Sequence, residues 1–192
     1  MHLPLFPLHA VLLPGGLMPL RVFETRYLDM IGRCLRENAA FGICLIRSGH
    51  DTGAPAEIHT TGVTARLIDW ESLEGGLLGV VAQGECKFRV RESHVEKDRL
   101  TVADVELLEP EPRLALPEDY APLADFLKGI LAHLTKPYDR VEPQYEDAGW
   151  VGGRLTELLP FKPALKQRLL ELEDPVARLE QLRLALQTRM FA

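Results

Sequence analysis

The fold is decided by residues 3–27, which read LPLFPLHAVLLPGGLMPLRVFETRY. Residues 3–23 are apolar but are interrupted by prolines at positions 4, 7, 14 and 19. Proline fixes φ and has no N–H to donate, so a long helix and a central strand are both disfavoured. Pro14-Gly15-Gly16 is a turn signal. We therefore expect short edge strands joined by turns over 3–23.

A helix is expected to follow, because apolar residues recur with the spacing of one helical face. They are Tyr27, Met30, Ile31, Cys34 and Leu35. Thr25 is predicted to cap the start of this helix, and Asn38 is predicted to end it. The compact apolar run at 41–46 is predicted to be a buried strand.

Residues 62–108 have the pattern of an antiparallel meander. Apolar and polar side chains alternate over 63–68 and 86–91, and Glu74-Gly75-Gly76 is typical of a turn between strands. The second run predicts a half-buried strand whose solvated face carries Lys87, Arg89 and Arg91. In all, roughly seven or eight short strands are expected, enough to curl into a small barrel-like sheet.

The composition changes after residue 109. Prolines at 110, 112 and 117 lie in a short acidic linker, and beyond it the apolar residues take up a helical period. Helices are predicted over 123–134, where Phe126 belongs to the apolar stripe, over 151–159, over 165–172 and from Asp174-Pro175 onward.

Strands that precede helices, rather than alternating with them, predict an α+β fold. We expect a β subdomain over 1–110, which contains one inserted helix. A helical subdomain, a C-terminal α-helical bundle, is expected over 111–192.

The composition is that of an ordinary globular protein, with 192 residues, 46% hydrophobic residues and a formal net charge of −6. This acidic balance argues against nucleic acid as a partner, because phosphate contacts need concentrated Lys and Arg. No stretch of about 18 apolar residues exists and no basic leader precedes the apolar start, so neither a membrane span nor a signal peptide is expected. The odd set Cys34, Cys44 and Cys86 fits a reducing compartment, and we expect a cytoplasmic protein.

Residues with the spacing of a catalytic or cofactor site are missing from the sequence. There is no P-loop and no Rossmann glycine motif, and no serine lies in a nucleophile elbow. The six histidines are dispersed, without the spacing of metal ligands. Cys34 is predicted to be inert because it lies on the buried face of its helix. We therefore expect no catalytic residue, no cofactor and no metal.

The sequence resembles one known family, the N-terminal substrate-binding domains of Lon proteases. The likeness is densest in LPLFPL, VLLPG and PLRVFETRY, which look like the family's opening motif. The segments that carry it are 3–8, 11–15, 19–27, 62–63, Gly84, 88–90, 155–160 and 166–171. Thr25 stands where the family usually has proline, and Leu13 stands where phenylalanine is common. The ATPase and Ser-Lys peptidase domains of full-length Lon have no counterpart in these residues.

The resemblance implies a PUA-like β-barrel-like sheet, followed by a small helical bundle. It also implies a role in recognising unfolded or tagged polypeptide segments. The expected function is therefore a non-catalytic, proteolysis-related module that binds unfolded or specific partner polypeptides. The alternative is a PUA-like module for nucleic acid or a small ligand, motivated by the basic face at Lys87. A hydrolase is a third hypothesis, which only kinship to Lon supports.

The opening motif has a structural and a functional interpretation. In the structural one, Arg21, Glu24 and Arg26 form ion pairs that pin the helix to the sheet. The barrel is then filled by Phe6, Leu8, Leu20, Val22 and Phe23. In the functional one, a groove between barrel and helix binds peptide and is bordered by Arg21, Phe23, Glu24, Arg26 and Tyr27. A second candidate surface is Trp70 with Leu73, near a predicted hairpin tip, because Trp is favoured in recognition sites.

Overall fold

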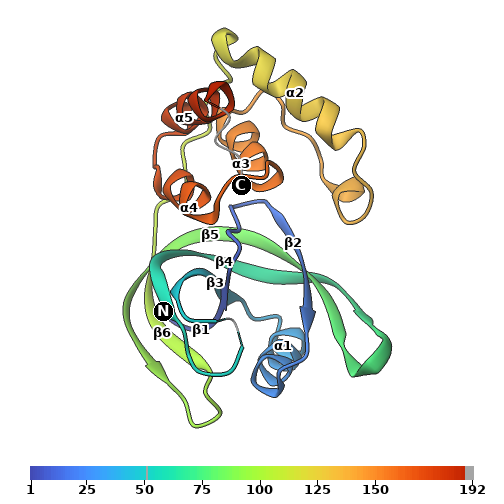
Figure 1. Ribbon diagram of the computed structural model, residues 1–192, viewed down its shortest axis with the longest axis vertical. Coiled ribbons are helices and arrows are strands. Elements are labelled where there is room, and N and C mark those ends of the chain that lie inside the picture. Colours follow the sequence, from blue (N-terminus) through green and yellow to red (C-terminus); the bar gives the residue numbers. More distant parts are fainter. Residues whose placement is uncertain (51, 189–192) are drawn as a thin grey trace. The chain divides into compact units, whose positions relative to one another are not determined.

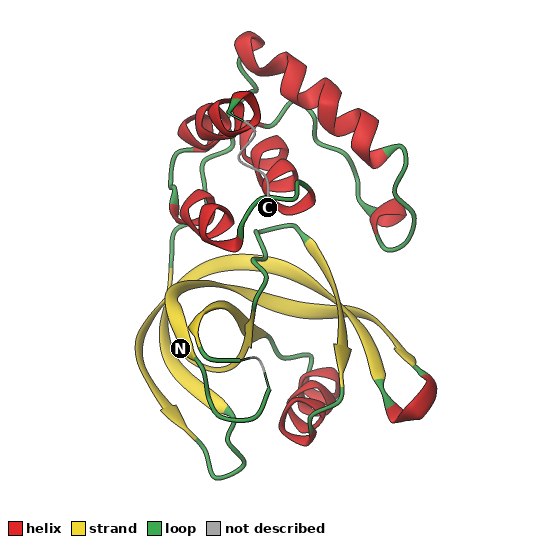
Figure 2. Cartoon of the chain, viewed as in Figure 1, coloured by secondary structure: helices red, strands yellow, loops and turns green. Residues whose placement is uncertain are grey.

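All the strands lie in one part of the chain, together with a helix, and the rest of the helices lie in the other part, as Figure 2 shows. The computed structural model describes residues 1–50 and 52–188. Six paired strands and one helix lie in a first unit, Met1–Glu109, and four further helices lie in a second unit that starts at Pro110 (Figure 1). The fold is therefore of the mixed α+β class, as the sequence predicted.

The first unit is one six-stranded sheet with a helix inserted between its second and third strands. The elements are β1 (His2–Leu8), β2 (Leu17–Val22), α1 (Thr25–Glu37), β3 (Phe41–Ser48), β4 (Glu57–Ser72), the 3-10 turn η1 (Glu74–Gly76), β5 (Leu78–Val95) and β6 (Thr101–Leu107). The strand order is β2-β5-β4-β3-β1-β6, and β5 also pairs with β6. Both ends of the sheet therefore pair with the same strand, β5.

The predicted number of strands was wrong, because β4 and β5 are long. They run for 16 and 18 residues. Register shifts occur between Val63 and Ala65, between Leu67 and Asp69, and between Val90 and Glu92. Such bulges bend a strand without ending it, so one strand covers what the residue pattern divides into two.

β1 is not the edge strand that its prolines predict. It pairs with β6 through His2–Leu5 and with β3 through Leu5–Leu8. Met1 and Val105 exchange backbone hydrogen bonds of 2.8 and 2.9 Å, so the odd-numbered residues of β1 turn their backbone groups towards β6. The backbone nitrogen of Pro4 therefore faces β3, but the pairing of β1 with β3 begins only at Leu5. The backbone nitrogen of Pro7 faces β6, but the pairing of β1 with β6 has ended at Leu5. Each proline lies where its missing N–H has no ladder partner.

The interior of this sheet is organised around Phe88, which is fully buried. Glycines on two neighbouring strands leave room for its ring. A Cβ atom at Gly42 would lie 2.8 Å from Phe88 Cζ, and one at Gly62 would lie 2.6 Å from the same atom. Both distances are well inside van der Waals contact, so these two positions must be glycine for the ring to pack as it does.

Two side chains of the first unit depart from their predicted surroundings. Lys87, predicted on a solvated face, is only 6% exposed. The N-cap of α1 is Glu24 rather than Thr25, and no side chain caps that end. Asn38 ends the helix as predicted, in a left-handed conformation with φ of 48°.

The second unit is a small helical bundle. Its elements are the 3-10 turns η2 (Glu118–Tyr120) and η3 (Tyr138–Arg140), with helices α2 (Ala121–Leu131), α3 (Ala148–Leu158), α4 (Pro163–Glu171) and α5 (Pro175–Gln187). All four predicted helices are present. The Asp174 side chain accepts a hydrogen bond from Val176 N–H, as a capping residue should. Phe126 was wrongly placed in the core stripe, since it is 45% exposed on α2.

A buried arginine holds the start of this unit to its last helix. Arg178 on α5 is 1% exposed and forms a paired contact with the carboxylate of Glu111. It also donates to the backbone carbonyls of Leu169 and Leu172. Because a planar guanidinium can satisfy several acceptors at once, it links three separate segments of the helical unit.

The packing at Phe88 predicts that Gly62→Ala destabilises the first unit. The added Cβ would meet both Phe88 Cζ and the Ile43 carbonyl at 2.6 Å. We expect a loss of about 1–3 kcal/mol in the free energy of unfolding, measured by urea titration. Gly32→Ala on α1 is the matched control, since its Cβ would lie 3.4 Å from a flexible arginine side chain. That control should gain up to about 1 kcal/mol. Equal stabilities for the two variants would contradict this account.

Candidate functional site

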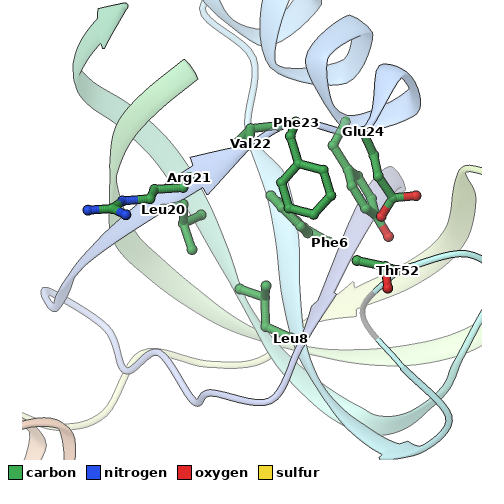
Figure 3. Close-up of a pocket in the computed structure, with 9 residues that line it drawn as sticks. Phe6, Leu8, Leu20, Arg21, Val22, Phe23, Glu24 and Thr52 are labelled. Atoms are coloured by element: carbon green, nitrogen blue, oxygen red, sulfur yellow. The ribbon is translucent and has the colours of Figure 1, made fainter. Parts of the chain in front are cut away.

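A small pocket of about 60 Å³ opens along the end of β2 and the start of α1 (Figure 3). Four of the residues predicted to border a groove line it, namely Arg21, Phe23, Glu24 and Tyr27. Its remaining lining residues are Phe6 and Leu8 of β1, Leu20 and Val22 of β2, and Thr52. The pocket is therefore largely apolar, and its polar lining groups are the Glu24 carboxylate, the hydroxyls of Tyr27 and Thr52, and Arg21.

The buried wall of the pocket is an aromatic pair. Phe6 and Tyr27 stack with their ring centroids 4.2 Å apart and their planes 19° from parallel. Both are almost fully buried, and Phe41 packs on Phe6 from the interior at 6.5 Å. Offset aromatic pairs gain about 0.5–1.5 kcal/mol beyond their burial, so this wall is rigid before any ligand arrives.

Phe23 gives the pocket an exposed aromatic side chain. It is 57% exposed, although the structural interpretation of the motif placed it in the barrel interior. It follows β2 and precedes the N-cap of α1, so it lies in the connection where the chain turns from strand to helix. In Figure 3 its ring lies among the lining side chains, with Phe6 close behind it in that view.

Arg26 lies behind this wall rather than in the pocket. It is 7% exposed, and its guanidinium lies 4.6 Å from the centroid of the Tyr27 ring. It donates to the Arg99 carbonyl at 2.9 Å and forms an ion pair with Glu24 at 3.0 Å. Arg26 thus joins the first turn of α1 to the β5–β6 connection. Of the expected ion pairs, the one between Glu24 and Arg26 is present, but both residues lie at the start of α1, and the contact that reaches the strands is the hydrogen bond to Arg99.

Arg21 differs from Arg26 in its surroundings. It is exposed, and in Figure 3 its guanidinium points away from the other lining side chains. Gly84 N–H donates to the Gly16 carbonyl, so by alternation Met18, Leu20 and Val22 turn their backbone groups towards β5. The backbone groups of Pro19 and Arg21 face the other edge of β2. Pro19 has no N–H to donate at this edge, whereas Arg21 presents both its N–H and its carbonyl there. Arg21 therefore offers the pocket its backbone and stem more than its charge.

The second predicted surface lies on the hairpin that joins β4 to β5. Trp70 is 59% exposed and stands in the cross-strand row Trp70–Val80–Leu20. Residues in such a row share a face of the sheet. Trp70 and Leu20, at the two ends of the row, are two strand spacings apart, which is about 10 Å. Trp70 thus shares a face with Leu20, which lines the pocket. Leu73 lies on the opposite face, since a Cβ at Gly79 would lie 3.2 Å from its side chain.

The basic face considered for RNA is smaller than the sequence predicted. Lys87 is buried, and the Arg91 guanidinium forms an ion pair with Glu106. Positively charged groups that are buried or paired are poorly placed to contact a phosphate backbone. Of the three basic residues, Arg89 alone is exposed without an ion pair among the described residues, and one such charge does not favour the nucleic-acid alternative over polypeptide binding.

A buried polar cluster in the helical unit joins α3 to its neighbours. Arg154 and Glu157 form an ion pair of 3.0 Å, and both are nearly excluded from solvent. Lys166 of α4 donates to the Glu157 carbonyl at 2.7 Å, and burial lowers the pKa of its ammonium group. Burial also raises the pKa of Tyr138 next to this pair. These contacts hold helices together, which is the usual role of such a pair within a bundle.

Metal-binding and membrane-spanning features were searched for over the described residues. Within 1–50 and 52–188, no group of three or more His, Cys, Asp or Glu side chains could hold a metal ion. In the same ranges, every helix is too short or too polar to cross a bilayer.

Comparison with known proteins identifies the family. The family model of the ATP-dependent protease La (LON) substrate-binding domain matches residues 2–188, and the chain belongs to this family. A solved structure of a Lon N-terminal domain protein from Xanthomonas campestris is 38% identical, with a TM-score of 0.78 over 95% of this chain and 96% of that one. The resemblance seen in the opening motif is thereby confirmed.

Full-length Lon proteases match over a small part of their length. Lon protease 2 of Myxococcus xanthus is 32% identical over 47% of this chain and 11% of its own. The Lon protease of Methylocella silvestris is 26% identical over 88% of this chain and 22% of its own. The chain therefore spans less than a quarter of these curated relatives.

The contacts of Arg26 predict a large difference between the two arginines of the motif. Arg26→Met keeps the aliphatic stem but leaves the Arg99 carbonyl and Glu24 without their buried donor. We expect it to lower the free energy of unfolding by about 2–4 kcal/mol. Arg21→Met, at an exposed position, should change it by less than about 0.5 kcal/mol. Urea titration measures both. Similar effects at the two positions would contradict the assignment of Arg26 to the wall.

The thiols predict slow modification of the native protein. Burial raises the pKa of Cys44 to about 12 and also raises the pKa of Cys34, so both are protonated and covered at neutral pH. Cys86 is only partly buried. In a timed reaction with a maleimide, we expect Cys86 to be labelled first and the other two only on unfolding. Rapid labelling of Cys44 in the folded protein would show that this thiol is not buried as described.

Proposed function

We propose that this chain is a non-catalytic module that binds polypeptides, either unfolded segments or a specific partner. Membership of the Lon substrate-binding domain family supports a substrate-recognition role like that of Lon N-domains. The observation that carries the proposal is the exposed Phe23 ring beside the stacked wall of Phe6 and Tyr27. An exposed aromatic beside a rigid apolar pocket is what an anchor for an apolar side chain requires.

The proposed contact residues fall into two groups. Phe23, Tyr27 and the Arg21 backbone form the pocket contact, while Glu24 and Arg26 position it through their ion pair. Trp70 forms the second contact, on the hairpin, and Leu73 is proposed as a contact residue on the opposite face of the same hairpin. The Trp70–Val80–Leu20 row supports a path from pocket to hairpin for one extended polypeptide. The pocket is too small for more than one or two side chains, so a partner would lie over it rather than inside it.

Three further assignments belong to the same proposal. The sheet is proposed to be of the PUA-like barrel kind, supported by the pairing of β5 with both β2 and β6. Subdomains over 1–110 and 111–192 are proposed as separate folding units. The cytoplasm is proposed as the location, supported by three free thiols, which suit a reducing compartment.

Binding is tested by fluorescence anisotropy of a labelled, permanently unfolded protein, titrated with this chain. We expect saturable binding to that probe and none to its folded counterpart. Phe23→Ala should weaken the binding by about thirtyfold or more, since hot-spot aromatics contribute about 2 kcal/mol or more. Because Phe23 is exposed, the variant should keep its stability.

Phe126→Ala is the matched control, because it removes a similarly exposed phenylalanine from the helical unit. Its affinity should equal that of the wild type. Absence of binding in the tens of micromolar, or equal losses in the two variants, would contradict the proposed role of the pocket.

A further inference from the structure

The hairpin that joins β4 to β5 projects beyond the rest of its sheet (Figure 1). We call residues 68–74 the Trp70 arm. Ile68 and Trp70 are both exposed large apolar side chains, at 40% and 59%. Within this unit no strand pairs with β4 here other than β5, so the arm is only two or three strands wide. Apolar side chains on such a projection have little packing role, which points to contact with a partner.

The charged residues of the arm's own sequence have one sign, although the exposed Arg21 of β2 stands in the cross-strand row Glu71–Gly79–Arg21. Between Arg66 and Lys87 the sequence contains no Lys, Arg or His, and its acidic residues are Asp69, Glu71, Glu74 and Glu85. Glu85 is paired with Arg66 at 2.7 Å, outside the arm. Glu71 and Glu74 are exposed, and in the described part of the chain neither forms an ion pair.

The indole of Trp70 is flanked along the chain by Asp69 and Glu71. By alternation along β4 their carboxylates face the other side of the strand, about one Debye length from the ring, so they act on it through the negative potential around the arm. A cation over a tryptophan face gains about 0.5–2 kcal/mol, and neighbouring negative charge adds to that attraction. An anionic segment at the same place would be repelled. The arm is therefore complementary to Lys or Arg carried on an apolar segment.

We propose that the Trp70 arm makes this module selective for polypeptide segments that combine apolar side chains with Lys or Arg. The inference rests on the proposed function and specifies its substrate class. The pocket at Phe23 supplies an apolar anchor, Trp70 lies on the same face of the sheet as Leu20, and the carboxylates of the arm favour the cationic chain. Electrostatic complementarity of this kind acts chiefly on specificity and association rate.

The test uses three labelled, permanently unfolded peptides with the same apolar residues, whose remaining positions are all Lys, all Gln or all Glu. With the wild-type chain, we expect the Lys peptide to bind about tenfold more tightly than the Glu peptide, a difference of about 1.4 kcal/mol. In E71Q/E74Q that ratio should fall to near one, while the affinity for the Gln peptide is unchanged. In W70A both the ratio and the affinity for the Lys peptide should fall.

E142Q/E173Q is the control, because it removes the same number of exposed carboxylates from the helical unit. It should keep the full Lys-to-Glu ratio, which separates the arm from the net charge of the protein. A Lys-to-Glu affinity ratio of one in the wild type, or a ratio that E71Q/E74Q leaves unchanged, would overturn the inference. Binding of the Gln peptide would in that case still support the proposed polypeptide binding. Failure of all three peptides to bind would overturn the proposed function as well.

Discussion

The stacking of Tyr27 on Phe6 is the contact on which the candidate site depends. It joins α1 to β1 across the opening at the end of β2, and the 4.2 Å separation leaves a flat apolar wall. Arg26 holds the same tyrosine from the neighbouring position and ties it to Arg99 and Glu24. Without this arrangement the strand-to-helix connection would have no fixed path, and Phe23 would have no surface beside it. The pocket therefore exists because α1 begins where it does.

A single short segment divides structural from exposed roles by alternation. Val22 and Tyr27 are buried, Phe23 and Thr25 are exposed, and Glu24 lies between these extremes. The buried side chains, Val22 and Tyr27, belong to the wall of the pocket, and the exposed side chains, Phe23 and Thr25, point to solvent. Because the chain passes from an extended to a helical path here, neighbouring side chains point in divergent directions. Such a segment can be decisive for the fold and still supply a surface for a partner.

Much of the fold could be predicted from the sequence, because its signals are local. The apolar period of α1, the proline at the start of α5 and the glycines of η1 each specify an element through nearby residues. What failed depends on distant partners. The burial of Lys87 depends on what packs on its face of β5, and the exposure of Phe126 depends on which helices pack on α2. The continuity of β4 and β5 depends on bulges that leave no simple residue pattern.

The candidate site was predictable in its location but not in its roles. The opening motif indicated the segment where the pocket lies, since four of its five proposed contact residues line it. Which of them pack and which are displayed was not predictable, because Arg21 and Arg26 look alike in sequence and differ only in what surrounds them. The link between Trp70 and the pocket also required the register of three strands, which sequence alone does not supply.

The central claim is that polypeptides bind along the end of β2, from the pocket towards the Trp70 arm. A ¹H–¹⁵N correlation NMR titration of the whole chain with an unfolded peptide tests it most directly, because each backbone amide reports on its own surroundings. The account predicts peptide-dependent shifts concentrated at residues 20–27 and 68–74, with the amides beyond Pro110 largely unaffected. Shifts confined to the helical unit would contradict it, and so would a peptide that leaves residues 20–27 unchanged.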